Sequence, residues 1–225
     1  MGSTIRVLNN VVAEYQARYA KPVLSLVMNR ADTVEAIFDA LLPFNFQLQN
    51  MDVFTEGNIT AQKIGFRLPE RNINFQFSAE FCTFVKQGAT WRTAEEDLAV
   101  LEAAEGALLR SKNIEVAARS VTISMHLQLL DTHLHDVMAP FLPAAFLSSK
   151  DPRLDDEYKP NRHAVLANWQ NGAVLLDKSN VAANAIYVRL TTESNGSIRQ
   201  LFEKLYRDEM YVFSVLNVQE ENPDE

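Results

Sequence analysis

The chain has 225 residues, which is enough for one large domain or two small ones. Hydrophobic residues make up 47% and charged residues 22%, and the 7 glycines and 8 prolines are too few for a collagenous or low-complexity chain. The 21 basic and 29 acidic residues give a net charge of −8, which disfavours binding to a nucleic-acid backbone.

The first elements are predicted from the spacing of apolar residues. An apolar residue recurs every three or four positions across 4–20, which predicts a helix that Pro22 ends. The apolar run at 23–29 contains β-branched residues and predicts a strand. A complete helical stripe across 32–42, stopped by Pro43, predicts a second helix. Strands are expected next at 46–54, 59–68 and 73–85.

A second set of elements follows in the same order. Thr93 begins a capping box, a Ser/Thr followed three residues later by Glu/Gln, and predicts a helix to about Arg110. The next expected elements are a long strand at 114–129, a helix at 132–146, and strands at 163–169, 173–176 and 181–192. A second capping box at Ser197 predicts a final helix to about Leu216.

The two halves of the chain share their apolar frame. Shifting the sequence by 100 residues aligns the helix at 34–43 with 134–143, and shifting it by 104 aligns the two capped helices. Two amphipathic helices can share a frame by chance, and residue identity between the halves is low. The common order of elements favours duplication. We therefore expect an α+β fold of two similar β-α-β-β-β-α halves, mainly antiparallel sheet covered by helices.

Four segments follow from this pattern. Residues 1–22 form an N-terminal helix, 23–113 the first half, 114–217 the second half and 218–225 an acidic tail. Phenylalanine is frequent, at 13 residues, and falls on both faces of predicted strands such as the one holding Phe81 and Phe84. This distribution predicts a sheet covered on both sides, by the other half, a second subunit or a ligand.

From about Phe75 onward the sequence resembles an uncharacterised, sporadically distributed family of bacterial proteins. The resemblance is carried by the strand into Phe84-Val85, Trp91 before the capped helix, Arg119 in the strand at 114–128, and the helix at 198–213. The family's usual Arg-Tyr-x-Asn is replaced here by Met125-His126-Leu127-Gln128. The resemblance implies an α+β architecture with duplicated halves and no catalytic residues, because the family has no established activity.

The single cysteine, Cys82, excludes an intrachain disulfide and a cysteine-rich metal site. The N-terminus lacks the apolar run of a signal peptide, and no run of eighteen apolar residues occurs. We expect a cytoplasmic protein that binds neither membrane nor nucleic acid. The polar segment 151–160 is expected to be a surface linker, or alternatively a mobile or partner-binding loop.

The candidate site residues are His126, Gln128, Arg119 and Ser124 on the strand at 114–129. If the polar face of this strand lined a cavity, His126 could act as a general base or orient a ligand. A plain hydrogen-bonded histidine is the commoner alternative. His133 and His135 lie two apart at a predicted helix start and would point away from each other, so neither a metal site nor a cofactor is expected. No catalytic residue is identified.

Two functions remain open from the sequence. The first is a non-enzymatic interaction protein that forms homo-oligomers through sheet or helix faces. The second is a small-molecule-binding or enzymatic domain with a pocket between curved sheet and helix, which would hold a small apolar ligand. The partner could equally be another protein.

Overall fold

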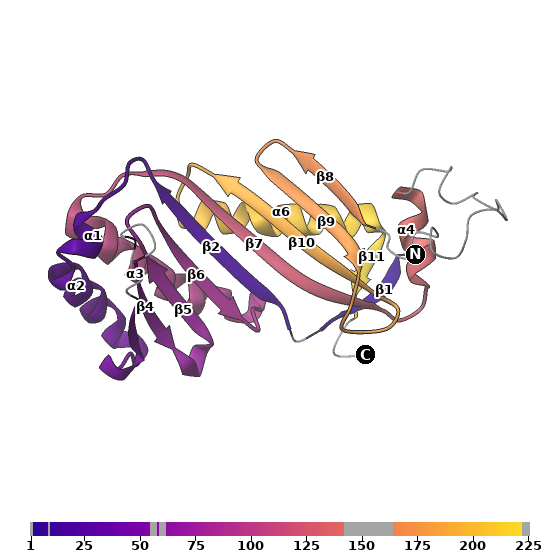
Figure 1. Cartoon of the computed structure of the whole chain (residues 1–225). Helices are drawn as coiled ribbons and strands as arrows, with labels where there is room; N and C mark the ends of the chain where they lie inside the picture. The colour runs from indigo at the N-terminus through magenta and orange to yellow at the C-terminus, as the bar shows by residue number, and fades with distance from the viewer. Residues whose placement is uncertain (1, 9, 55–57, 59–61, 142–163, 222–225) are drawn as a thin grey trace. The chain divides into compact units, whose positions relative to one another are not determined.

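The computed structural model describes residues 2–8, 10–54, 58, 62–141 and 164–221 (Figure 1). Helices and mainly antiparallel strands alternate along the chain, which confirms the predicted α+β class. The chain divides into two compact units. Unit 1 comprises 1–11, 123–191 and 205–225, and unit 2 comprises 12–122 and 192–204. The units do not follow the predicted halves, because one strand at 116–129, another at 185–194 and a helix at 198–216 contribute residues to both.

The strands of unit 2 follow the row β3-β4-β5-β6-β2, with the first part of β7 after β2. Their bounds are β2 (Val12–Tyr19), β3 (Met51–Phe54), β4 (Lys63–Leu68), β5 (Ile73–Phe77), β6 (Phe81–Gln87) and β7 (Val116–Leu129). The pairs β3–β4, β4–β5, β5–β6 and β6–β2 are all antiparallel. Buried residues alternate along these strands, as a sheet with one core face requires.

The strands of unit 1 follow the row β7-β10-β9-β8, with β1 on the other side of the end of β7 and β11 beyond β1 (Figure 1). Their bounds are β1 (Ser3–Val7), β8 (Val165–Trp169), β9 (Gly172–Lys178), β10 (Ala185–Ser194) and β11 (Val218–Glu220). β1 pairs antiparallel with β7 and parallel with β11. The β8–β9 hairpin closes through Gln170 and Asn171, with Asn171 in the left-handed conformation at φ 60°.

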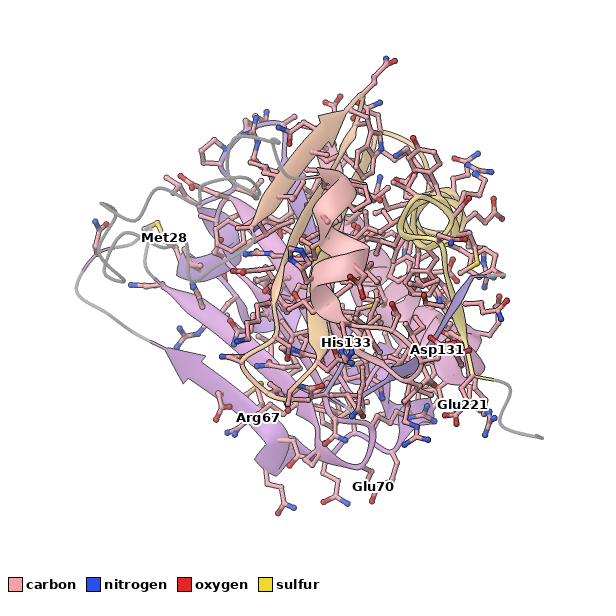
Figure 2. The ribbon with its side chains drawn as sticks, turned by 90° about the vertical axis from the view of Figure 1, so that its right-hand side faces the viewer. Met28, Arg67, Glu70, Asp131, His133 and Glu221 are labelled. Atoms are coloured by element: carbon pink, nitrogen blue, oxygen red, sulfur yellow. The ribbon has the colours of Figure 1, made fainter. Side chains whose placement is uncertain are left out.

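Two of the described helices are much longer than the others. They are α3 (Ala94–Lys112) and α6 (Ile198–Leu216), and the shorter helices are α1 (Ser25–Met28), α2 (Ala31–Leu41) and α4 (Leu134–Met138). α2 packs against α3. The Met28 side chain on α1 projects outward (Figure 2). None of the helices among the described residues has the length and apolar character needed to cross a membrane.

Among the described residues, the later elements follow an order similar to the earlier ones but with one helix and one strand fewer. The first series is β2, α1, α2, β3, β4, β5, β6 and α3, and the second is β7, α4, β8, β9, β10 and α6. α3 and α6 each have 19 residues at an offset of 104, and each ends at an asparagine in the left-handed conformation, Asn113 at φ 50° and Asn217 at φ 53°.

The predicted N-terminal helix at 1–22 is wrong, because this region contains β1 and β2. Tyr15, Ala17 and Tyr19 are buried while Gln16 and Arg18 are exposed, so the period is two rather than 3.6. Pairing with β6 fixes this strand. The strand predicted at 23–29 is also wrong, since α1 lies there.

Three further expectations concern the tail at 218–225, the strand at 73–85 and the segment at 151–163. The acidic tail predicted at 218–225 is wrong for 218–220, which form β11 because they pair with β1. The single strand predicted at 73–85 is two, β5 and β6, joined through Ser78. The loop at 151–160 and the strand start at His163 lie outside the described residues.

Hydrogen bonds to two carboxylates hold β1 of unit 1 in place. The Thr4 backbone N–H donates to both carboxylate oxygens of Asp131, at 2.9 and 3.0 Å, and this holds the pKa of Asp131 below its ordinary value. Arg6 donates to Glu221 at 2.7 and 3.0 Å. Asp131 and Glu221 are labelled in Figure 2. Residues near β1 and β11 are therefore held together within unit 1.

Candidate functional site

His126 lies in unit 1, on β7, and is only 8% exposed. Its Nδ1 atom lies 2.8 Å from Ser179 Oγ, and its ring lies 5.0 Å from that of Tyr187 on β10. Ser179 Oγ also accepts hydrogen bonds from the N–H groups of Val181 and Ala182, at 3.1 and 3.3 Å. The hydroxyl hydrogen therefore points to Nδ1, which assigns the ring proton to Nε2.

This arrangement is a poor serine nucleophile. An activated serine needs its oxygen free to attack while a base removes its proton. Here Ser179 is only 5% exposed, and its Oγ accepts hydrogen bonds from two backbone N–H groups. These hydrogen bonds fix the turn after β9. His126 and Ser179 thus join a turn to a strand, and the geometry favours structure over covalent catalysis.

Burial lowers the pKa of His126 from its ordinary value of 6.5. Between the lowered pKa and 6.5 the unfolded chain binds a proton that the folded chain does not, so stability falls as pH falls through this window. We expect wild-type protein to lose more stability between pH 7.5 and pH 5 than a His126→Gln variant, measured by urea unfolding. Parallel pH profiles of the two proteins would contradict this expectation.

The structure places Ser124 and Gln128 on the same side of β7 as His126, since alternate residues share a face. The Tyr187 hydroxyl donates to Ser124 Oγ at 3.2 Å. Both Ser124 and Gln128 are half-buried. Three of the four predicted residues therefore lie along one strand face, and Tyr187, which sequence reasoning missed, joins them.

Arg119 does not join this group. It has the opposite parity on β7 and lies in unit 2, where its Nε and Nη2 atoms donate to Glu105 at 3.3 and 3.4 Å. Nε also lies 3.0 Å from the Tyr15 hydroxyl, which donates to Glu105 at 2.6 Å, and Nη1 donates to the Gly196 carbonyl at 3.2 Å. Burial lowers the pKa of Arg119, but attraction to Glu105 outweighs it and the net shift is upward.

Cys82 lies on the core face of β6 and is fully buried. Burial raises the pKa of its thiol, so the reactive thiolate is not available at neutral pH. The Tyr19 hydroxyl interacts with this thiol and makes no well-formed hydrogen bond to the described residues. Cys82 is therefore a packing residue rather than a nucleophile.

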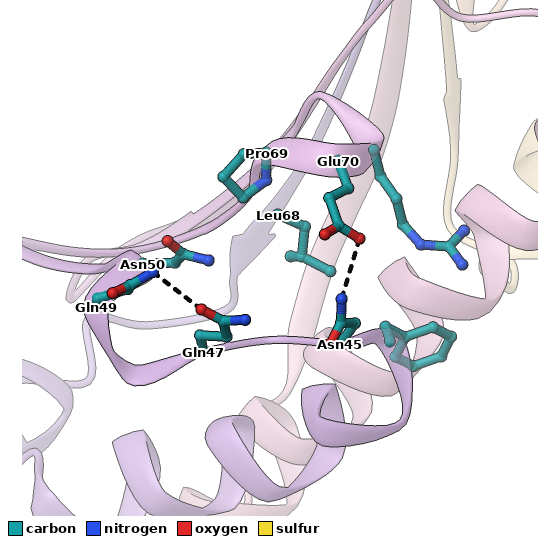
Figure 3. Close-up of a pocket in the computed structure, with 9 residues that line it drawn as sticks. Asn45, Gln47, Gln49, Asn50, Leu68, Pro69 and Glu70 are labelled. Atoms are coloured by element: carbon teal, nitrogen blue, oxygen red, sulfur yellow. Dashed lines mark hydrogen bonds between the residues drawn. The ribbon is translucent and has the colours of Figure 1, made fainter.

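A small open crevice occurs in unit 2 beside the turn after β4 (Figure 3). Its volume is about 160 Å³, roughly that of five water molecules. Its lining is mostly polar: Phe44, Asn45, Gln47, Gln49, Asn50, Leu68, Pro69, Glu70 and Arg71. Asn45 donates to Glu70 at 3.0 Å and Gln49 donates to Gln47 at 2.9 Å. Polar side chains of the lining thus bond to one another, and the crevice is not the apolar pocket expected between sheet and helix.

The edge strand β8 is largely exposed. Leu166 is 66% exposed, and Ala167 and Asn168 are also exposed. Within the described residues β9 is its one neighbour. The thirteen residues from Ala164 to Leu176 include no charged residue and no proline. By contrast, the edge strand β3 carries Asp52, paired with Arg67 at 2.6 Å, and β11 carries Glu220.

The outer side of α6 in unit 1 also carries large apolar side chains. Their exposed fractions are 47%, 38%, 64% and 46%, for Tyr206, Met210, Tyr211 and Val215 respectively. The positions 104 residues earlier, on α3, hold Glu102, Gly106, Ala107 and Ser111. These positions also differ in exposure, because Ala107 on α3 is buried whereas Tyr211 on α6 is 64% exposed. We call these four residues the α6 stripe.

No family model matches the chain, and no curated protein matches it. Among solved structures, the regulatory subunit of aspartate kinase from Thermus flavus aligns at 11% identity over 86% of this chain and 88% of that chain, with a TM-score of 0.23. A conserved hypothetical protein from Pyrococcus furiosus aligns at 10% identity over 92% and 91%, with a TM-score of 0.18. At these scores neither structure informs the function of this chain.

Proposed function

We propose that this chain is a non-enzymatic cytoplasmic interaction protein whose partners include copies of itself. The observation that carries the proposal is the open, uncharged edge of β8. A strand at the end of a sheet presents unpaired N–H and C=O groups, and proteins normally protect such edges with charges, prolines or a covering segment. Residues 164–176, which include β8, carry no charge and no proline, which favours pairing with another chain.

The α6 stripe supports the same function. Tyrosine and methionine are enriched at protein interfaces relative to the rest of the surface. Contact with a protein would explain why Tyr206, Met210, Tyr211 and Val215, all large and largely apolar, are exposed on α6. The single buried cysteine supports a reducing compartment, where disulfides are rare.

The alternative of a small-molecule-binding or enzymatic site has less support. It needed His126, Gln128, Arg119 and Ser124 around one pocket. Arg119 instead pairs with Glu105, and His126 accepts a hydrogen bond from a serine that fixes a turn. Arg119 and His126, the residues best suited to catalysis or ligand binding, instead make hydrogen bonds that stabilise the fold.

The proposal is tested by the molar mass of the purified chain between about 1 and 100 µM, by sedimentation velocity and light scattering. We expect the mass to rise from one copy toward two with concentration. A single copy at every concentration would count against self-association.

A further inference from the structure

The β8 edge has a defined pattern of free backbone groups. Trp169 and Gly172 flank the two-residue loop of the β8–β9 hairpin, so they form a hydrogen-bonded pair. Such pairs alternate along an antiparallel ladder, so Val165, Ala167 and Trp169 direct their backbone groups toward β9. Leu166 and Asn168 therefore direct their N–H and C=O groups toward the open edge.

We infer that two copies of the chain join through β8, antiparallel, with a two-fold axis at Ala167. This inference rests on the proposed function and names its partner as a second copy of this chain. The axis places Leu166 opposite Asn168 of the other copy, so the free groups of both strands meet in four N–H···O=C hydrogen bonds.

Two properties of β8 favour a second copy over another occupant. Each copy has a net charge of −8, and like charges directly opposite one another on paired strands are unfavourable. The uncharged residues of β8 allow two such copies to meet without this repulsion. The two-fold axis at Ala167 also produces two cross-strand pairs, each of Val165 from one copy and Trp169 from the other. Aromatic residues pair well with β-branched ones across strands.

The first test removes a free edge donor while preserving the hairpin. Asn168→Pro deletes an N–H that points away from β9, a position where an edge strand tolerates proline. Each dimer loses two hydrogen bonds, so we expect its dissociation constant to rise roughly 10- to 100-fold in sedimentation velocity. A matched variant, Met210→Glu with Tyr211→Glu on the α6 stripe, is expected to dimerise like wild type.

The second test reads the register and does not depend on the proline variant folding. In Ala167→Cys the two introduced thiols face each other as a non-hydrogen-bonded pair with Cα atoms about 4.5 Å apart, within disulfide range. Oxidised glutathione should convert it to a covalent dimer. In Leu166→Cys the Cα atoms of the two introduced cysteines lie about 8 to 9 Å apart, which is too far for a disulfide. Cys82 is buried and does not compete.

The outcomes separate the inference from the proposed function. Wild-type protein that stays a single copy overturns both. Wild-type dimers that persist in Asn168→Pro, with no faster cross-linking of Ala167→Cys than of Leu166→Cys, overturn the β8 contact and leave self-association standing. Loss of the dimer in the α6 stripe variant, with these results, would place the contact on that helix.

Discussion

Replacing Arg119 with Met is expected to lower the free energy of unfolding by about 3 to 5 kcal/mol, the range for breaking a buried ion pair by removing one partner. The side chains of Arg119 and Glu105 are 16% and 4% exposed. Without the guanidinium, the Glu105 carboxylate keeps only the Tyr15 hydroxyl as a partner among these groups. Urea unfolding of the full chain measures the loss.

Arg199 provides a matched control for this prediction. It pairs with Glu95 and Glu102 at 3.0 Å each, distances shorter than that between Arg119 and Glu105, but its side chain is 50% exposed. Water screens exposed ion pairs, so Arg199→Met should have a much smaller effect than Arg119→Met. Equal losses in the two variants would show that burial does not decide the outcome.

A double variant isolates the cause. Arg119→Met combined with Glu105→Gln leaves no buried charge, and exchanging a buried ion pair for neutral groups is often nearly neutral in stability. We expect the double variant to recover most of what Arg119→Met loses. A double variant as unstable as the single one would indicate lost packing rather than an unpaired charge.

The two long helices were predictable because their signals are local. The capping boxes predicted starts at Thr93 and Ser197, and the structure has α3 from Ala94 and α6 from Ile198. At Ser197 both bonds of the box form, since its N–H donates to Gln200 at 2.9 Å and the Gln200 N–H donates to Ser197 Oγ at 3.3 Å. At Thr93 the hydroxyl donates instead to Asp97, four residues along the chain, so another local hydrogen bond replaced the box while the helix remained.

The N-terminal strands were missed because long-range pairing decided them. The apolar spacing of 4–20 fits a helix, but the alternation of polar and apolar residues from Glu14 to Tyr19 fits the observed strand. That alternation was the available signal. Short apolar runs are ambiguous between helix and strand, and the partner strand β6 lies more than sixty residues away in sequence.

The candidate site was predictable only in part, for a related reason. Parity along one strand puts Ser124, His126 and Gln128 on one face, and Tyr187 contacts both Ser124 and His126. The same parity separates Arg119 from them, which was readable from the sequence. Ser179 and Tyr187 lie on a turn and on another strand. No local sequence pattern predicts that their side chains contact His126.

The abundance of phenylalanine also has a structural explanation that can be tested. Phe66 on β4 is fully buried, and its ring centroid lies 5.6 Å from Phe46, 6.4 Å from Phe75 and 6.2 Å from Phe77. Phe66→Ala is therefore expected to lower the free energy of unfolding by about 3 to 5 kcal/mol, as for other buried aromatic residues. A Phe66→Leu variant should lose less and remain folded for comparison.

Phe81 is the matched control, because it lies on the opposite face of β6 from the core residues Cys82 and Phe84 and is half-buried. The Lys63 ammonium lies 5.8 Å from the centre of its ring. We expect Phe81→Ala to lower the free energy of unfolding by only about 1 kcal/mol, since the ring keeps part of its surface in water. If Phe81→Ala instead equalled Phe66→Ala in urea unfolding, that face would be covered in solution, as the two-sided sheet predicted from the sequence requires. A small loss would leave the face uncovered, and the core of unit 2 would then lie on one side of its strands alone.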